Sequence, residues 1–143
     1  LKRMGIQSRI TLDTAKKLIE RLEQEAVRRG QRAVIAVCNP EGNPVAVHVM
    51  DGAFLVSFDV AMKKAYTAVA VKMSTMELSK IAQLGGTFYG VDKLDGGKIV
   101  IFGGGIPLKS GNTIIGGLGI SGGTGEEDHS LAEYGQSVLN EIL

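Results

Sequence analysis

The stretch Asn112–His129, NTIIGGLGISGGTGEEDH, constrains the fold of this chain more than any other part of the sequence. It begins as an apolar, β-branched run, continues as closely spaced glycines and ends at an acidic helix start. Gly116, Gly117 and Gly119 predict a central strand with one flattened face, against which a helix or a second subunit can pack closely. The glycines between 122 and 125 then allow a sharp turn of the backbone.

Three of these glycines, Gly117, Gly119 and Gly122, also spell G-x-G-x-x-G, the fingerprint of dinucleotide-binding βαβ units. That fingerprint requires a second parallel strand with an acidic residue at its end, about 20 positions later. Here a single helix follows the glycines, and Glu141 lies inside it. We therefore interpret the glycines as packing and turn residues and not as a nucleotide site.

Composition excludes several classes of function. The 143 residues are 44% apolar and 22% charged with a net charge of +1, which indicates one globular domain and no nucleic-acid partner. No apolar run approaches the roughly 20 residues of a membrane helix, so no membrane partner is expected. Cys38 is the only cysteine and lies in an apolar run, which predicts a buried thiol and a cytoplasmic protein.

Hydrophobic periodicity and capping residues predict the elements. Residues 1–10 are expected to form a flexible N-terminal arm, and residues 11–143 a single domain. Strands are expected at 33–38, 45–49, 98–102 and 113–121, with a short further run at 106–108. Helices are expected from Thr11 to about 29, at 55–73, after a Ser74–Glu77 capping box and after a Thr124–Glu127 capping box. Because the strands come in hairpin-linked groups and do not alternate with helices, the pattern favours an α+β fold with an antiparallel sheet.

The two histidines are the first candidates for chemistry. His48 lies near the end of the second strand, three residues before Asp51, and His129 follows Asp128 in the first turn of the last helix. Neither has a histidine at i+4 or a cysteine partner, so the sequence shows no zinc site. His48 is either an ordinary sheet-face residue or an axial ligand of a haem iron, and the residues alone leave both open. Lys63 and Lys64, in the long helix, face either an anion or solvent, and a solvated face is the default interpretation.

Four sequence blocks resemble a known family. HVMDGAFLVSFDVAMKKAYTA, QLGGTFYG, FGGGIPL and GLGISGGTGEEDHSLAEYG are similar to the successive signature blocks of the GlcG/HbpS-like family. That family includes the C-terminal domain of PduO-type cobalamin adenosyltransferases, and QLGGTFYGVDK resembles this branch most. The resemblance covers residues 11–143 and implies a profilin-like fold, a five-stranded antiparallel sheet between helices, in homo-oligomers.

The resemblance also implies a function. Family members bind haem, some are linked to haem degradation or redox sensing, and PduO-like members occur with coenzyme-B12-dependent diol or glycerol use. The leading hypothesis is a cytosolic ligand-binding domain for haem or a corrinoid such as cobalamin, with Gly104, Gly105 and Ser121 among glycine-lined loops that admit a flat ring. PduO-type haem domains are thought to use a histidine of the first helix. Residues 11–30 contain no histidine, so His48 is the substitute candidate.

Two other functions remain open on the sequence. One is a small-molecule enzyme with a site formed by Asp51, Lys64, Ser121 and Asp128, although no recognisable nucleophile or acid–base set is present. The other is a non-catalytic partner domain that docks onto a B12-dependent enzyme.

The apolar residues of the 55–73 helix spread more widely than one core-facing stripe needs. We therefore expect at least a homodimer, joined through that helix or through the strand 113–121. The alternative is that the loop 85–97 covers the surplus apolar surface.

Overall fold

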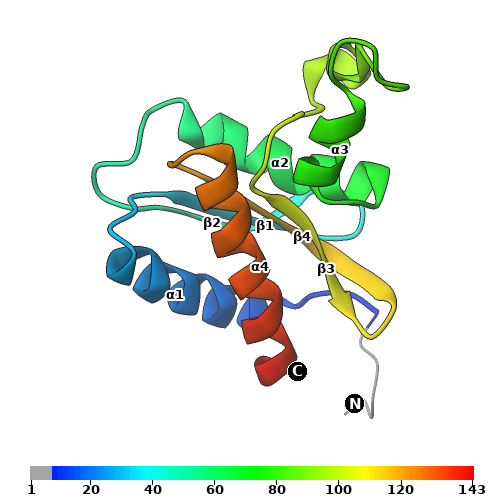
Figure 1. Cartoon of the computed structure of the whole chain (residues 1–143). Coiled ribbons are helices and arrows are strands. Elements are labelled where there is room, and N and C mark those ends of the chain that lie inside the picture. The colour runs from blue at the N-terminus through cyan, green and yellow to red at the C-terminus, as the bar shows by residue number, and fades with distance from the viewer. Residues whose placement is uncertain (1–7) are drawn as a thin grey trace.

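One antiparallel sheet forms the centre of the molecule in the computed structural model, which describes residues 8–143 (Figure 1). Its strand order is β2-β1-β4-β3, so the glycine-rich strand lies in the interior of the sheet. The strands are β1 (Val34–Cys38), β2 (Pro44–Val49), β3 (Gly105–Ser110) and β4 (Thr113–Ser121). The prediction of an antiparallel α+β fold is confirmed, and a profilin-like arrangement stays a prediction.

The sheet has four strands in the described residues, not the five that the resemblance implied. The prediction of a strand at 98–102 is wrong, because this segment has no regular secondary structure. Its residues Ile99 and Val100 are nevertheless buried, as apolar residues of a strand would be. The N–H of Val100 donates to Oγ1 of Thr67 at 3.0 Å, and the Thr67 hydroxyl lies 3.2 Å from the carbonyl oxygen of Lys98. A helix side chain therefore satisfies the N–H of Val100, which a neighbouring strand would otherwise pair with.

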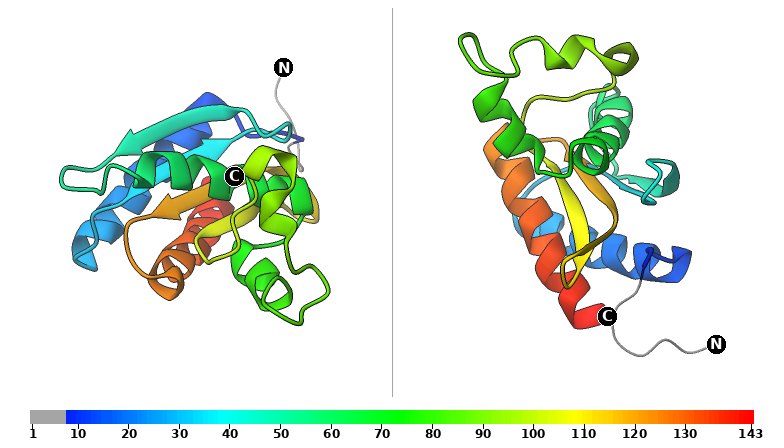
Figure 2. Two further views of the ribbon diagram at one scale, coloured as in Figure 1. Left: turned by 90° about the horizontal axis from the view of Figure 1, so that it is seen from above. Right: turned by 90° about the vertical axis from the view of Figure 1, so that its right-hand side faces the viewer.

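Four helices cover the two faces and one end of the sheet (Figures 1 and 2). They are α1 (Leu12–Arg28), α2 (Ser57–Val71), α3 (Thr75–Ile81) and α4 (Gly125–Ile142). The caps predicted at Thr11, Ser74 and Thr124 are confirmed, and the last two form complete capping boxes. The main core lies between the sheet and the helices α1 and α4, where Leu18, Leu22 and other residues are fully buried.

Helix α2 packs directly on the glycine-rich strand β4. A Cβ on Gly119 would overlap the backbone oxygen of Ala61, and a Cβ on Gly117 would overlap that of Ala65. A helix of the same chain thus covers the flattened face of β4. The sequence had predicted either a helix or a second subunit at this face. Because β4 is buried and flanked by β1 and β3, the prediction that this strand joins two subunits is wrong.

Two further segments complete the fold. The segment between α3 and β3 projects from the body in all views and contains two short 3-10 turns, Val91–Lys93 and Asp95–Gly97 (Figure 2). The hydroxyl of Tyr66 in α2 donates to the carboxylate of Asp95, which fastens this segment to the helix.

Most of the arm predicted over residues 1–10 lies outside the described residues. Ile10, however, is buried and its N–H donates to the oxygen of Ile115 at 2.8 Å, so the packed domain begins there. No described helix is long and apolar enough to cross a membrane.

Candidate functional site

The predicted site residues fall into two groups, one buried and one at the surface. The buried group surrounds Lys64, whose side chain is only 1% exposed. Its ammonium donates to the carbonyl oxygen of Ile120 at 2.7 Å and to Oδ2 of Asp128 at 3.1 Å, and it lies 5.1 Å from the ring centroid of Phe102. Lys64 therefore faces an anion, one of its two predicted alternatives, and that anion is Asp128.

Asp128 is held at the start of α4 by backbone donors. Its carboxylate accepts from the N–H of Gly123 at 2.9 Å and of Gly122 at 3.3 Å, in addition to Lys64. A carboxylate in the first turn of a helix is also favoured by the helix dipole. Ser121 lies next to this cluster, with its hydroxyl 3.2 Å from that of Ser57.

Gly104 and Gly105 belong to the same buried cluster but do not line an open loop. A Cβ on Gly104 would lie 2.6 Å from Nζ of Lys64, and one on Gly105 would overlap the Lys64 carbonyl oxygen. The two glycines therefore leave room for Lys64 and its helix, and they do not line a loop that is open to a flat ligand. Burial lowers the pKa of Lys64, and the charge of Asp128 acts in the opposite direction.

The surface group consists of His48 and Asp51, at the seam between α1 and the edge strand β2. His48 Nδ1 lies 2.9 Å from Oε2 of Glu23 in α1, and the histidine side chain is 43% exposed. Asp51 lines a groove of about 660 Å³ at this seam, which we call the α1–β2 groove. Its lining residues are Glu23, Val27, Gly30, Gln31, Arg32, Val49, Met50 and Asp51. No hydrogen bond or ion pair of the described residues joins Asp51 to the Lys64 cluster.

Sequence reasoning missed the residues that α1 and its end contribute to this groove. Glu23 lies 25 positions before His48, and Val27 follows Glu23 by one helical turn. Only the packing of α1 against β2 brings them beside the predicted residues. Gln31 was also missed, and its Nε2 is buried without a hydrogen-bond partner among residues 8–143.

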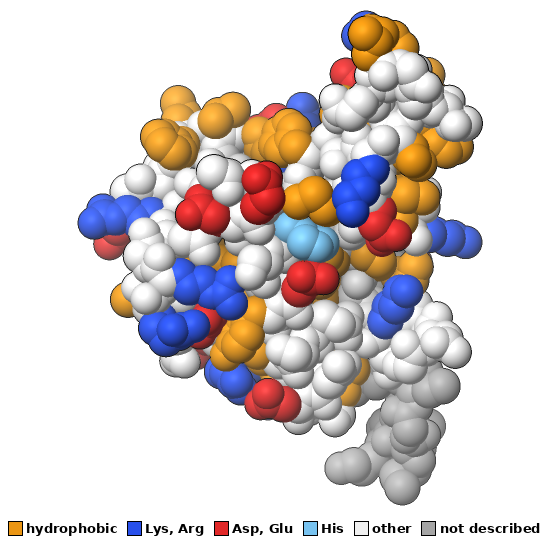
Figure 3. Space-filling view, in the orientation of Figure 1, with side chains coloured by type: hydrophobic (Ala, Val, Ile, Leu, Met, Phe, Trp, Pro, Cys, Tyr) orange, Lys and Arg blue, Asp and Glu red, His pale blue; other side chains and the backbone are white. Residues whose placement is uncertain are grey.

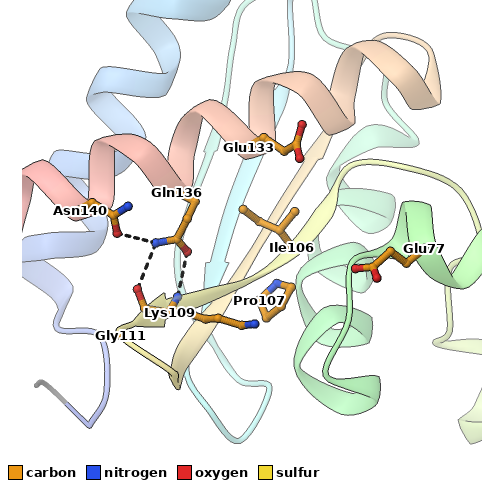
Figure 4. Close-up of a pocket in the computed structure, with 8 residues that line it drawn as sticks. All are labelled: Glu77, Ile106, Pro107, Lys109, Gly111, Glu133, Gln136 and Asn140. Atoms are coloured by element: carbon orange, nitrogen blue, oxygen red, sulfur yellow. Dashed lines mark hydrogen bonds between the residues drawn. The ribbon is translucent and has the colours of Figure 1, made fainter.

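A second groove, of about 570 Å³, lies between α4, β3 and α3 (Figure 4). Glu133 of α4 and Glu77 of α3 face it from opposite sides, and Gln136 spans from α4 to the backbone of Lys109. His129 adjoins this groove through Glu133, which lies 3.4 Å from its Nε2. The described residues contain no cluster of three or more side chains suited to a metal ion.

Comparison with known proteins gives consistent matches. Residues 10–137 match the family model described as "Haem degrading protein HbpS-like". The chain is 38% identical over 133 residues to an uncharacterized 15.0 kDa protein from the dhaT-dhaS intergenic region of Citrobacter freundii, covering 93% of this chain and 94% of that protein. It is 40% identical over 126 residues to the corrinoid adenosyltransferase PduO of Salmonella typhimurium, covering 85% of this chain but only 38% of that enzyme.

A solved structure, the PduOC:heme complex, superimposes with a TM-score of 0.86 at 36% identity, covering 90% of this chain and 94% of that one.

Proposed function

The chain belongs to the family of haem-degrading, HbpS-like proteins, and we propose that it binds haem in the α1–β2 groove with His48 as the iron ligand. The haem complex of the similar PduOC structure supports the choice of ligand. The contact between His48 and Glu23 supports the choice of place, and it is the observation on which the proposal rests.

A carboxylate can only accept, so a hydrogen bond to Glu23 requires that His48 carries its proton on Nδ1. In the neutral form of the ring Nε2 then keeps its lone pair, and no described residue hydrogen-bonds to it. Metal-binding histidines commonly donate their other ring N–H to a carboxylate, which fixes the ring and raises its basicity. Glu23 thus orients His48 and leaves its free nitrogen available to a metal.

The groove adjoins this pair through Glu23, which is one of its lining residues, whereas His48 itself is not among them. Val27, Val49 and Met50 supply apolar lining, and the side chain of Val49 is 55% exposed. The orphaned amide of Gln31 adds a donor that lacks a partner within the described chain. The residues present therefore fit a haem, which when bound would supply an iron centre for redox chemistry or for binding a small ligand.

His129 fits this role less well than His48. Its side chain is 20% exposed, and its Nε2 is engaged by Glu133 while Nδ1 is buried without a partner in the described residues. A histidine of α1 is absent, so an iron ligand from that helix is not available in this chain.

We further propose that the protein acts as a homo-oligomer and accompanies coenzyme-B12-dependent diol or glycerol utilisation. The exposed apolar residues at the start of α2 support the assembly, and the PduO relative supports the context. The chain spans 38% of PduO, so the adenosyltransferase activity of that enzyme is not carried over to it. A corrinoid is the second candidate ligand, because that relative is a corrinoid enzyme.

Titration of the purified protein with hemin tests the proposal. We expect a saturable shift of the porphyrin absorption band for the wild type and for His129→Ala, and at least about tenfold weaker binding for His48→Ala. Glu23→Gln should bind hemin with an altered iron spin state, because the ring of His48 loses its orienting carboxylate.

A parallel titration with cobalamin distinguishes the second ligand. A shift with cobalamin alone would overturn the haem proposal and favour a corrinoid site. Unchanged hemin affinity and an unchanged spectrum in His48→Ala would refute the assigned iron ligand.

A further inference from the structure

The α1–β2 groove contains a cation without a counter-ion. Of the five arginines in residues 8–143, Arg9 pairs with Glu41, Arg21 with Glu141, and Arg28 and Arg29 both with Glu25. Arg32 forms no ion pair and no side-chain hydrogen bond within this described part, and it lines the groove. An arginine fork is suited to bidentate contacts with a carboxylate, so this side chain retains its full capacity to bind one.

Arg32 lies against the turn that follows β2. A Cβ on Gly52 would lie 2.5 Å from Nη1 of Arg32 and 2.8 Å from its Cδ, so the arginine side chain lies directly against this glycine. Gly52 has a φ of +84°, which most other residues adopt only with strain. The backbone of Arg32 is also confined, because a Cβ on Gly122 would overlap its carbonyl oxygen. The side chain of Arg32 thus lies across the Met50–Ala53 turn, at the groove.

The other charged groups of the groove affect an anion differently. Glu23 is engaged with His48, whereas Asp51 is exposed and has no ion pair in the described residues. Asp51 therefore repels a ligand carboxylate that approaches Arg32. Gln31 also lines the groove, and its Nε2 is buried without a hydrogen-bond partner among the described residues.

We propose that Arg32 recognises a carboxylate of the ligand in the α1–β2 groove and makes the site selective for porphyrins with free acid side chains. This inference rests on the proposed haem function and names the feature of the ligand that the site selects. His48 binds the metal, the apolar lining contacts the ring, and Arg32 pairs with a carboxylate at its edge. Arg32 then pairs with a carboxylate of the ligand, as the other four described arginines pair with carboxylates of the chain.

The test compares hemin with its dimethyl ester, which has the same ring and iron but no free carboxylate. Wild type should bind hemin at least about tenfold more tightly than the ester, because hydrogen bonds to charged groups contribute more than neutral ones. Arg32→Gln should lose this preference and keep its affinity for the ester, with an unchanged iron spin state. Lys16→Gln, an exposed α1 residue outside the groove, is the control of equal charge change and should keep the preference.

Two further variants sharpen the result. Asp51→Asn should strengthen hemin binding without affecting the ester, because it removes a repelling charge. Arg32→Lys should retain part of the preference, since it keeps the charge but not the fork. Equal binding of both porphyrins by the wild type, or a preference retained in Arg32→Gln, would overturn the role of Arg32 while haem binding stands. Absence of a saturable shift with either porphyrin would remove the haem function itself and this inference with it.

Discussion

Lys64 and Asp128 form an ion pair in which the two side chains are only 1% and 2% exposed. Removing two charges from water is costly, and their attraction compensates only when further hydrogen bonds satisfy the remaining donors and acceptors. Here the carbonyl oxygen of Ile120 and two backbone N–H groups do so. The pair joins α2, β4 and the start of α4, and this geometry supports a structural role. A catalytic site formed by Asp51, Lys64, Ser121 and Asp128 stays a prediction. The structure does not favour it, because Asp51 lies at the α1–β2 groove and has, among the described residues, no hydrogen bond or ion pair to the Lys64 cluster.

Lys64→Met should destabilise the fold by about 3–5 kcal/mol, because it leaves the carboxylate of Asp128 buried without its counter-charge. The double variant Lys64→Met with Asp128→Asn should cost clearly less, since the amide oxygen still accepts from the N–H of Gly123 and no charge remains. Urea unfolding at one fixed protein concentration measures the wild type, these two variants and the single variant Asp128→Asn. A double variant as unstable as the sum of its two single variants would show that the charges are not coupled.

The sequence indicated which residues were candidates but not which ones meet. Lys64 and Asp128 were both singled out, yet 64 positions separate them, and no local pattern predicts their contact. Glu23 and Arg32 carried no signal at all, because solvated acidic and basic residues on a helix and before a strand are common. Their importance arises only when α1 packs beside β2. Local capping chemistry, by contrast, depends on residues three apart and was predicted correctly at Ser74 and Thr124.

At the scale of elements, the two edges of the sheet differ. The backbone groups on the free edge of strand β3 are not available to another strand. The N–H of Gly105 donates to Thr75, and Pro107 has no N–H. The N–H and the carbonyl oxygen of Lys109 both bond to the side chain of Gln136. This protection prevents unwanted pairing with another chain. Strand β2 contacts only β1, α1 and α2 among the described elements. The edge that adjoins the proposed site is therefore the less protected one.

The close packing of α2 on β4 gives a prediction for an element. Gly119→Ala should destabilise the protein by about 3 kcal/mol or more, because its new methyl group overlaps the carbonyl oxygen of Ala61 and forces the helix away from the strand. Adding Ala61→Gly should not restore stability, because the obstructing atom belongs to the backbone. Thermal unfolding of the wild type, Gly119→Ala and the double variant measures the effect, and rescue by Ala61→Gly would refute this account of the contact.

The glycines of β4 show which features of a strand can be predicted from the sequence. Their spacing in β4 correctly indicated a flattened face, because a strand without side chains on one side leaves room for a close neighbour. The same pattern could not tell a helix of this chain from a second subunit. The segment 98–102 failed for a related reason: its apolar residues are buried, but Thr67 of a distant helix provides the partner for its backbone.

At the scale of the whole molecule, much apolar surface is left uncovered. Phe54, Leu55, Val56 and Phe58, which we call the α2-start patch, are 46–95% exposed. Leu84, Phe88, Tyr89 and Leu94 of the projecting segment are 49–86% exposed. Figure 3 shows apolar side chains gathered along the upper rim of the molecule, over the start of α2 and over the projecting segment. The loop at 85–97 therefore adds apolar surface of its own and leaves the α2-start patch exposed, whereas its coverage of the later apolar residues of α2 stays a prediction.

Contiguous exposed apolar surface of this kind marks an interaction site, and closed symmetric homo-oligomers are the commonest arrangement. We predict that light scattering gives at least twice the chain mass of 15.1 kDa. Leu55→Asp, at a residue 95% exposed, should shift the protein towards the monomer because a charge at the centre of an interface has to be desolvated. Leu12→Asp places the same charge on a residue 55% exposed at the start of α1 and should leave the mass unchanged. A monomer that persists in the wild type at high concentration would refute the interface. An oligomer disrupted by Leu12→Asp and not by Leu55→Asp would move the interface from the α2-start patch to the start of α1.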